Sequence, residues 1–579
     1  MPIRGSADLL PHYMAELDYL YTAGAEFGRR YHDVAGALEF SRQGSNDPHV
    51  QRLIESFAFL TARLQRTYDA QFPEIPAALL DILYPQLTAP IPSMSIAAFH
   101  PDPDQPASLT GISVPTGTEL FASAPQEGAE DLTCRFRTGY PVTLWPLEVA
   151  DARLEPPPDA SAFTDSVGLT DVQSVLRIRL RCLGKATFAH FAPSSLRFFL
   201  PPPSNSREAI YELLFTHLRG IAADANAGAT QPAGEPAPQP VLLRTAQLQS
   251  VGFGAEDALL PCPPASHQAY RLLQEYFAFP DKFLFFDIAQ LPPGAFGTGT
   301  TADLILLLDS PARLPIRVNR ASFALGCTPI INLFPRVTEP IRLDHTRLEY
   351  RLAPDSRRES SVEIHSIQRA IRSVAQAERG QVIRPLFSMR HADMMGRGEA
   401  MYYARRQPVS HPDLSGSEML LSFVDPDLDP KLPADDVVFA HVMCTNRGLA
   451  EQIVGGTPLN LEIDLPVSGV SCLNRPTRQL EPPTSGGTLW RLVSHLSVNH
   501  LSIAEGEDGI AVLREILLLY CPSEDLAATK RINGLKSLSS RRIVRHIGAD
   551  AWRGFCRGLE INLEYDESAF PGVSAYLFG

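Results

Sequence analysis

The chain contains 579 residues, of which 44% are hydrophobic, and 65 acidic residues outweigh 51 basic ones to give a net charge of −14. This balance counts against a general nucleic-acid binder, whose surface would be basic. No stretch approaches the roughly 20 apolar residues of a membrane span, and the N-terminus lacks a secretory pattern. The eight cysteines are spread singly, so we expect them to be reduced in a cytoplasmic protein. The length of the chain predicts roughly three to five domains.

Two tandem helices with heptad-type stripes are predicted before any strand-rich sequence appears. Asp47 and Pro48 are typical of a helix start, and Pro73 ends that helix. The first stripe consists of Tyr13, Leu17, Leu20, Gly24, Phe27 and Tyr31, and the second consists of Val50, Leu53, Phe57, Leu60 and Leu64. The spacing places each set on one helix face. The stripes could close on each other or join helices of other chains in a bundle, and periodicity does not choose between these arrangements.

Strand-rich sequence begins at Ser93, where short apolar segments alternate with Pro, Gly and Asp. Before this strand-rich sequence, a further short helix is expected from Pro76. Further helices are expected at 207–221, 269–279, 489–503, 510–520 and 524–531, and strands at 175–183, 283–288, 302–309, 316–327 and 560–565. In the helix at 269–279, Leu272, Leu273, Tyr276 and Phe277 make an apolar face.

These elements predict a multidomain α+β fold. We expect an N-terminal helical arm at 1–92 and a first β-rich domain at 93–240, which closes with a helix and a flexible Pro/Ala loop from residue 222. A mixed domain follows at 241–345, and a third β-rich domain with C-terminal helices occupies 346–579. Because the chain stops at SAYLFG in mid-pattern, we expect further C-terminal sequence.

Candidate chemistry is weak throughout the sequence. Asp425, Asp427, Asp429 and Asp436 have the spacing of a calcium loop, but Pro430 replaces the required Gly. Gly294, Gly297 and Gly299 lack the Lys of a phosphate loop, so a hairpin loop is expected there. His495 and His500 are out of step for one helical face. We therefore predict no catalytic, cofactor or metal site, although a hydrolase or metal-dependent enzyme and a generic adaptor remain alternatives.

Aromatic residues on turn-rich segments are the remaining positive signal. The examples are Phe334, Trp490, Tyr402 and Tyr403. Aromatic residues and Arg are enriched at interface hot spots, so these residues could serve subunit contact. Core packing is the alternative.

Long segments in order along the chain resemble the TssF family, a baseplate subunit of the bacterial type VI secretion system. The N-terminal segments are YMAELDYLYTAGAEFGRRY and DPHVQRLIESFAFLTARLQRTYDAQFPEIPAALLDILYPQLTAPIPSMSI. AYRLLQEYFAFPDKFLFFDI, INLFPRVTEPIRLDHTRLEYRLAPD and GLEINLEYDESAFPGVSAYLFG continue the resemblance. Residues 222–240 look like an insertion relative to the family.

The resemblance implies a structural, non-enzymatic wedge subunit without a metal or cofactor. In this family two TssF copies join one TssG, TssK trimers attach to the wedge, and TssE connects it to the contractile sheath around the spike and hub. The baseplate is cytoplasmic and docks at the inner-membrane complex. A wedge subunit of another phage-tail-like injection device is the nearest alternative.

The family also favours the shared bundle, because N-terminal helices of two copies join a third subunit in related assemblies. We therefore predict subunit contact at the residues of the two stripes, namely Tyr13, Leu17, Leu20, Phe27, Tyr31, Val50, Leu53, Phe57, Leu60 and Leu64.

Overall fold

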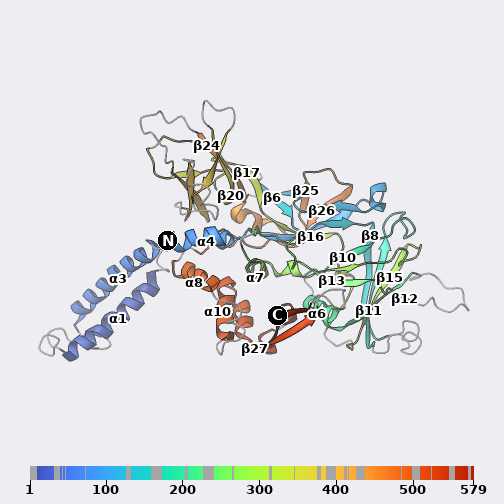
Figure 1. Ribbon diagram of the computed structural model, residues 1–579, viewed down its shortest axis with the longest axis horizontal. Coiled ribbons are helices and arrows are strands. Elements are labelled where there is room, and N and C mark those ends of the chain that lie inside the picture. Colours follow the sequence, from blue (N-terminus) through green and yellow to red (C-terminus); the bar gives the residue numbers. More distant parts are fainter. Residues whose placement is uncertain are drawn as a thin grey trace, which may run out of the picture. The chain divides into compact units, whose positions relative to one another are not determined.

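The computed structural model describes most of the chain. The described residues are 9–30, 40–41, 44–45, 47–71, 74–124, 132–157, 172–202, 206–225, 240–263, 266–311, 316–344, 346–373, 380–386, 400–409, 414, 416–424, 437–483, 486–497, 509–522, 524–546, 555–570 and 575–578. The chain divides into two compact units. We call Met1–Thr88 with Pro483–Ser497 the helical unit, and Ala89–Pro482 with Val498–Gly579 the β unit. Figure 1 labels several elements of each unit.

The helical unit contains the two predicted tandem helices. Its elements are α1 (Leu9–Arg30), β1 (Phe40–Ser41), β2 (Gly44–Ser45), α3 (Pro48–Gln71), α4 (Glu74–Leu83), η1 (Pro85–Leu87) and α8 (Gly486–Ser497). The predicted cap of α3 is confirmed, because Oδ1 of Asp47 accepts a hydrogen bond of 2.8 Å from the amide of His49. α1 and α3 run in opposite directions and pack against each other, and α8 packs against α3 and α4 (Figure 1).

A closed barrel forms one part of the β unit. Its strand order is β16-β3-β26-β25-β5-β6. The strands are β3 (Met94–Pro101), β5 (Glu119–Ala124), β6 (Leu132–Thr138), β16 (Cys327–Ile331), β25 (Pro458–Leu461) and β26 (Val467–Cys472). The barrel therefore draws strands from three of the four segments expected from the sequence, and that four-part division stays a prediction.

Two further sheets share the largest apolar core of the β unit. The five-stranded sheet has the order β12-β11-β15-β9-β8, and the three-stranded sheet has the order β10-β14-β13. The elements here are β8 (Leu147–Glu155), β9 (Ser174–Cys182), β10 (Ser195–Phe199), α6 (Arg207–His217), β11 (Leu218–Asp224), β12 (Val241–Leu242), β13 (Gln247–Val251), α7 (Gln268–Ala278), η3 (Pro280–Phe283), β14 (Phe285–Ala289), β15 (Thr301–Leu308) and η4 (Arg320–Ser322). A small pair of β4 (Ile112–Val114) and β7 (Val142–Leu144) and the 3-10 helix η2 (Pro106–Leu109) complete this region.

An eight-stranded sheet follows in sequence. Its strands are β17 (Phe334–Val337), β18 (Ile341–Arg342), β19 (Tyr350–Leu352), β20 (Glu363–Ser373), β21 (Gln381–Pro385), β22 (Met401–Pro408), β23 (Ser417–Val424) and β24 (Val437–Thr445), after which comes η6 (Arg447–Gln452). The chain then forms α10 (Gly509–Tyr520), α11 (Leu526–Asn533), a two-stranded ribbon of β27 (Leu535–His546) and β28 (Phe555–Tyr565), η7 (Glu567–Ala569) and α12 (Ala575–Phe578).

Several sequence expectations are corrected by the structure. The helix expected at 207–221 ends at His217, because the chain enters β11 at Leu218. The strand expected at 316–327 is absent before Cys327, since Asn319 and Ser322 close a capping box around η4. The glycine-containing segment after β14 is no hairpin loop, because β14 and β15 belong to different sheets. The strand expected at 175–183 is confirmed in β9, where Arg177 and Arg179 on one face both bind Asp303.

The length and hydropathy of the helices in the described part of the chain bear on membrane insertion. None of them combines the length and the apolar character that crossing a bilayer requires.

Candidate functional site

The two faces of α3 differ sharply in burial. Ile54 is 9% exposed, and Ala58 and Ala62 have no exposed surface. Gln51 lies on the same side and donates a hydrogen bond of 2.6 Å to the hydroxyl of Tyr21 on α1. The side of α3 that packs on α1 therefore consists of small or polar residues and one Ile, which allows the helices a close approach.

The predicted stripe of α3 lies on another side and is largely uncovered. Leu53 is 72% exposed, Phe57 56%, Leu60 57% and Leu64 70%, whereas Val50 is half-buried. We call Leu53, Phe57, Leu60 and Leu64 the α3 seam. Four large apolar side chains in one row on a helix are characteristic of a surface that another helix covers. The alternative in which the two stripes close on each other is wrong for α3.

The predicted stripe of α1 is less exposed. Tyr13, Leu17 and Leu20 are half-buried. Desolvation raises the pKa of the Tyr13 phenol, and the carboxylate of Glu55 on α3 adds to this effect. The side chain of Phe27 and the whole of Tyr31 lie outside the described residues. The structure therefore brings part of the α1 stripe toward α3 while the α3 seam faces away.

Other exposed apolar residues of the helical unit were missed at the sequence level. Leu10 and Met14 on α1 are each 58% exposed, and Phe59 on α3 is 49% exposed. The four-residue spacing of Leu10 and Met14 was the available signal. Trp490 on α8 is 45% exposed, as an interface residue would be, whereas Phe334 and Tyr402 are core residues at 2% and 8%.

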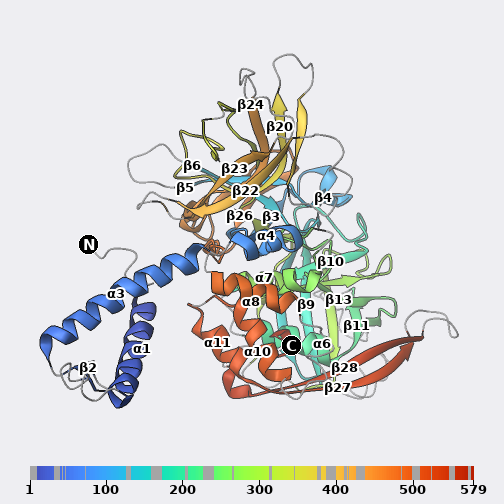
Figure 2. The same ribbon diagram turned by 60° about the vertical axis from the view of Figure 1, so that its left-hand side comes forward.

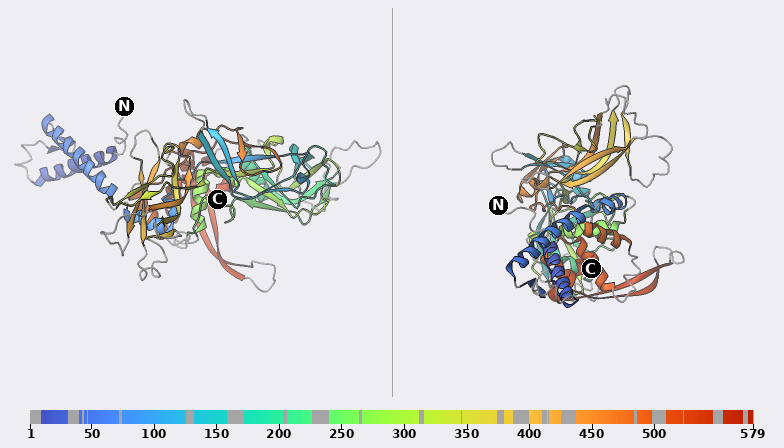
Figure 3. Two further views of the ribbon diagram at one scale, coloured as in Figure 1. Left: turned by 90° about the horizontal axis from the view of Figure 1, so that it is seen from above. Right: turned by 90° about the vertical axis from the view of Figure 1, so that its left-hand side faces the viewer.

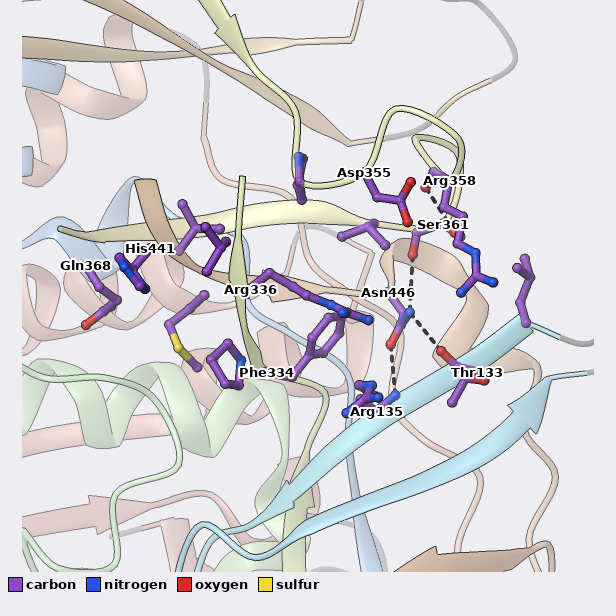
Figure 4. A pocket seen from close by; sticks show the side chains of 17 residues that line it. Thr133, Arg135, Phe334, Arg336, Asp355, Arg358, Ser361, Gln368, His441 and Asn446 are labelled. Atoms are coloured by element: carbon purple, nitrogen blue, oxygen red, sulfur yellow. Dashed lines mark hydrogen bonds between the residues drawn. The ribbon is translucent and has the colours of Figure 1, made fainter. Parts of the chain in front are cut away.

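A pocket of about 530 Å³ opens in the β unit between the barrel strand β6 and the eight-stranded sheet (Figure 4). Its lining residues with ionisable side chains include Arg135, Arg336, Arg358, Asp355 and His441. At its floor Oδ1 of Asn446 accepts from the amide of Arg135 at 3.0 Å, and Nδ2 donates to the carbonyls of Thr133 and Ser361, both at 3.3 Å.

Several side chains that line this pocket contact neighbouring residues of the same sheet. The hydroxyl of Ser361 donates to the carbonyl of Arg358 at 3.0 Å. The side chain of Arg336 stacks over the ring of Phe334, and His441 packs beside Phe439. All three contacts lie within the eight-stranded sheet and its connecting segments, and none of them pairs a nucleophile with a base.

The remaining candidate chemistry has no geometric support within the described ranges. Residues 425–436 and His500 lie outside them, and His495 is buried, which lowers its pKa. Burial raises the pKa of the Cys134, Cys182, Cys327 and Cys444 thiols to about 12, so these thiols are poor nucleophiles at neutral pH. Nowhere in the described ranges do three or more His, Cys, Asp or Glu side chains come together as they would around a metal ion.

Known proteins match this chain over nearly its full length. The family described as "Type VI secretion system, TssF" matches residues 5–579. The type VI secretion system component TssF1 of Pseudomonas aeruginosa is 35% identical, over 99% of this chain and 93% of the relative.

Two solved structures are also similar. A cryo-electron microscopy structure of the TssK-TssF-TssG baseplate subcomplex contains a chain with 25% identity and a TM-score of 0.69, covering 91% of this chain and 92% of that one. A structure of the baseplate complex from the type VI secretion system shares the fold at 24% identity and a TM-score of 0.54, covering 95% and 89%. The chain belongs to the TssF family of type VI secretion system baseplate components.

Proposed function

We propose that this chain is a structural wedge subunit without enzymatic activity, which enters the baseplate by docking its helical unit into a bundle with a TssG-like subunit and a second copy of itself. TssK-like trimers and a TssE-like connector to the sheath complete its partners, and the assembly sits on the cytoplasmic side of the inner membrane. The single observation that carries this proposal is the exposed α3 seam. The presence of TssF with TssK and TssG in a solved baseplate subcomplex supports the choice of partners.

The energetics favour burial of the α3 seam by another helix. Fully burying a Leu or Phe side chain is worth about 1.5–3 kcal/mol. Each residue of the α3 seam keeps more than half of its surface exposed in the single chain. Covering all four would therefore contribute several kcal/mol toward association, before the cost of ordering the partners.

The stripe of α1 is proposed to take part at its uncovered edge. Tyr13, Leu17 and Leu20 are half-buried, so a third helix could contact them and the α3 seam together. The proposed subunit contact also includes Phe27, Tyr31 and Val50, for which heptad spacing is the only support.

The test is co-expression with a TssG-like subunit, followed by native mass measurement. One copy of this chain adds 63.5 kDa, so a two-to-one complex is readily separated from a one-to-one complex. We expect the two-to-one mass. A well-folded chain that stays alone would contradict the wedge role.

A paired substitution assigns the docking face. Phe57→Asp together with Leu60→Asp should reduce co-purification at least 100-fold, because each places a charge in an apolar helical contact. Phe59→Asp is the matched control, since Phe59 is also exposed but lies about 200° around the helix from Phe57. Equal loss with the control, or undiminished binding by the double variant, would show that the α3 seam is not the docking face.

A further inference from the structure

Within the described residues, the β27–β28 ribbon is anchored to the β unit at its base, next to α10 and α11. The strands pair without interruption from Ser537↔Glu564 to His546↔Phe555. At the base, Leu535 and Tyr565 pack with Leu517 of α10 and Ile532 of α11. Figures 2 and 3 show the ribbon leaving this base and extending away from the sheets of the β unit. A two-stranded ribbon is only marginally stable in water unless something covers one of its faces.

The pairing register divides the ribbon into two chemically different faces. Directly opposed residues share a face, and successive residues alternate. One face, which we call the apolar face of the ribbon, carries Leu538, Val544, Phe555, Leu559, Ile561 and Leu563. Val544 is 62% exposed, Phe555 67% and Ile561 53%. The period-two pattern is that of a strand with one buried face, yet the outer part of this face remains uncovered.

Charge is also divided between the two faces. The acidic residues of the described ribbon strands, Glu560 and Glu564, both lie on the other face. There Glu560 pairs with Arg541 at 2.6 Å, and Glu564 accepts from the Ser537 hydroxyl at 2.7 Å. The charged residues among the apolar side chains, Arg542 and Arg557, are basic.

We propose that the apolar face of the ribbon docks an amphipathic, acidic helix of a partner subunit. A two-stranded ribbon is about as wide as one helix. The uncovered stretch from Ile561 to Phe555 spans about 20 Å, which corresponds to roughly 13 helical residues. Carboxylates beside the apolar stripe of that helix would meet Arg542 and Arg557.

A second copy of the ribbon is a poorer occupant. Stacking two apolar faces would bring the arginines of one copy toward the arginines of the other. Water is excluded from such a contact, so the repulsion between the like charges would be strong. The charge pattern therefore favours a partner of opposite sign over self-association.

The inference rests on the proposed function, because the partner is sought within the baseplate complex. The probe is the photo-crosslinker p-benzoylphenylalanine, placed at Phe555 in the full chain co-expressed with its TssK-like and TssG-like subunits. The control places it at Cys556, which is exposed and adjacent but points to the opposite face. Native mass measurement of the same samples reports whether the complex has assembled.

We expect the probe at Phe555 to crosslink another subunit at least fivefold more than the probe at Cys556. The crosslinked peptide should have apolar residues at helical spacing together with Asp or Glu. Equal crosslinking from both positions, a crosslink to a second copy of this chain, or no crosslink in an assembled complex would overturn the inference. Failure of the complex to assemble would instead overturn the proposed function, and the inference with it.

A charge reversal provides a second, independent readout. Arg557→Glu should lower the crosslinking yield from Phe555 several-fold, because it opposes the acidic helix. Arg545→Glu, on the opposite face, should leave the yield unchanged. Equal crosslinking yields from both variants would show that the partner does not contact Arg557 through acidic residues, and this result would overturn the inference.

Discussion

Lys282 and Glu275 form an ion pair with no exposed surface on either side chain, and Nζ lies 2.5 Å from Oε2. The same carboxylate oxygen accepts from Arg271 at 3.0 Å, while Oε1 accepts from the amides of Leu259 and Leu260, both at 2.9 Å. One carboxylate therefore pairs with two buried cations and accepts hydrogen bonds from two backbone amides. Desolvation lowers the pKa of Lys282, and the charge of Glu275 opposes this effect.

Glu275→Gln should be strongly destabilising to the β unit. It leaves two buried cations without their counter-charge, a change that costs about 3–5 kcal/mol when a buried pair is broken. Hydrogen exchange at the amides of Leu259 and Leu260 should accelerate more than 100-fold. Glu256→Gln, on an exposed side chain nearby, is the control and should change exchange little. Unchanged protection in Glu275→Gln would show that the amides are held by other contacts.

His365 should make the eight-stranded sheet acid-sensitive. Its ring is buried, and desolvation followed by the charges of Arg406 and Arg137 lowers its pKa from 6.5 to about 3. Between these values the unfolded chain binds a proton that the folded chain excludes, so the free energy of unfolding falls as pH falls below 6.5. The expected loss from pH 7 to pH 5 is about 2 kcal/mol.

The measurement is the pH dependence of local opening in β20 and β24, by hydrogen exchange corrected for intrinsic rates. His365→Asn cannot titrate in this range, so its profile should lack the part of the slope that His365 supplies. Because the comparison is a difference between two proteins, the other titrating groups cancel. Parallel profiles for both proteins would contradict the assignment to His365.

Local features of the fold follow from the sequence, whereas its long-range pairings do not. The cap at Asp47 and the alternation in β9 are encoded within a few residues. In contrast, Ala98 of β3 pairs with Ser471 of β26 inside the barrel. Pairings across such sequence separations leave no local periodicity, so the barrel could not be predicted from one sequence.

The core face of α7 was also hidden from pattern analysis. Its apolar residues predicted a face formed by Leu272, Leu273, Tyr276 and Phe277, yet the residues that it buries most are Arg271, Gln274 and Glu275. Polar residues are expected outside. Their burial is tolerable because Glu275 pairs with Arg271 and Lys282 and accepts from the amides of Leu259 and Leu260.

The candidate interface shows the same division between local and long-range information. Spacing alone identified the residues of the α3 seam. It could not show that α1 packs on a neighbouring side that carries Ala58 and Ala62, because small residues give no hydrophobic periodicity. The exposure of the α3 seam therefore became visible only in the fold.

The hydrogen bonds of Asn446 should stabilise the contact between the barrel and the eight-stranded sheet. In addition to its bonds to β6, Oδ1 accepts from Nδ2 of Asn332 at 2.8 Å. Asn446→Ala leaves several buried groups without partners, and we expect a loss of about 2–4 kcal/mol. The amide of Arg135, which loses its acceptor, should exchange at least tenfold faster. Gln368→Ala in the same pocket is the control, and a similar effect there would contradict a specific role for Asn446.

The two faces of α3 should respond to substitution in opposite ways. Ala58 is fully buried, so Ala58→Leu adds three carbons to the packed side of the helix. Such overpacking typically costs about 1–3 kcal/mol, and it should release α1, seen as faster exchange of α1 amides in the free chain. Leu60→Ala removes an exposed side chain, so α1 should stay protected in the free chain while binding to the TssG-like subunit weakens. If Leu60→Ala instead loosened α1 without affecting binding, the α3 seam would belong to the interior of the helical unit, and the assignment of a docking face would be wrong.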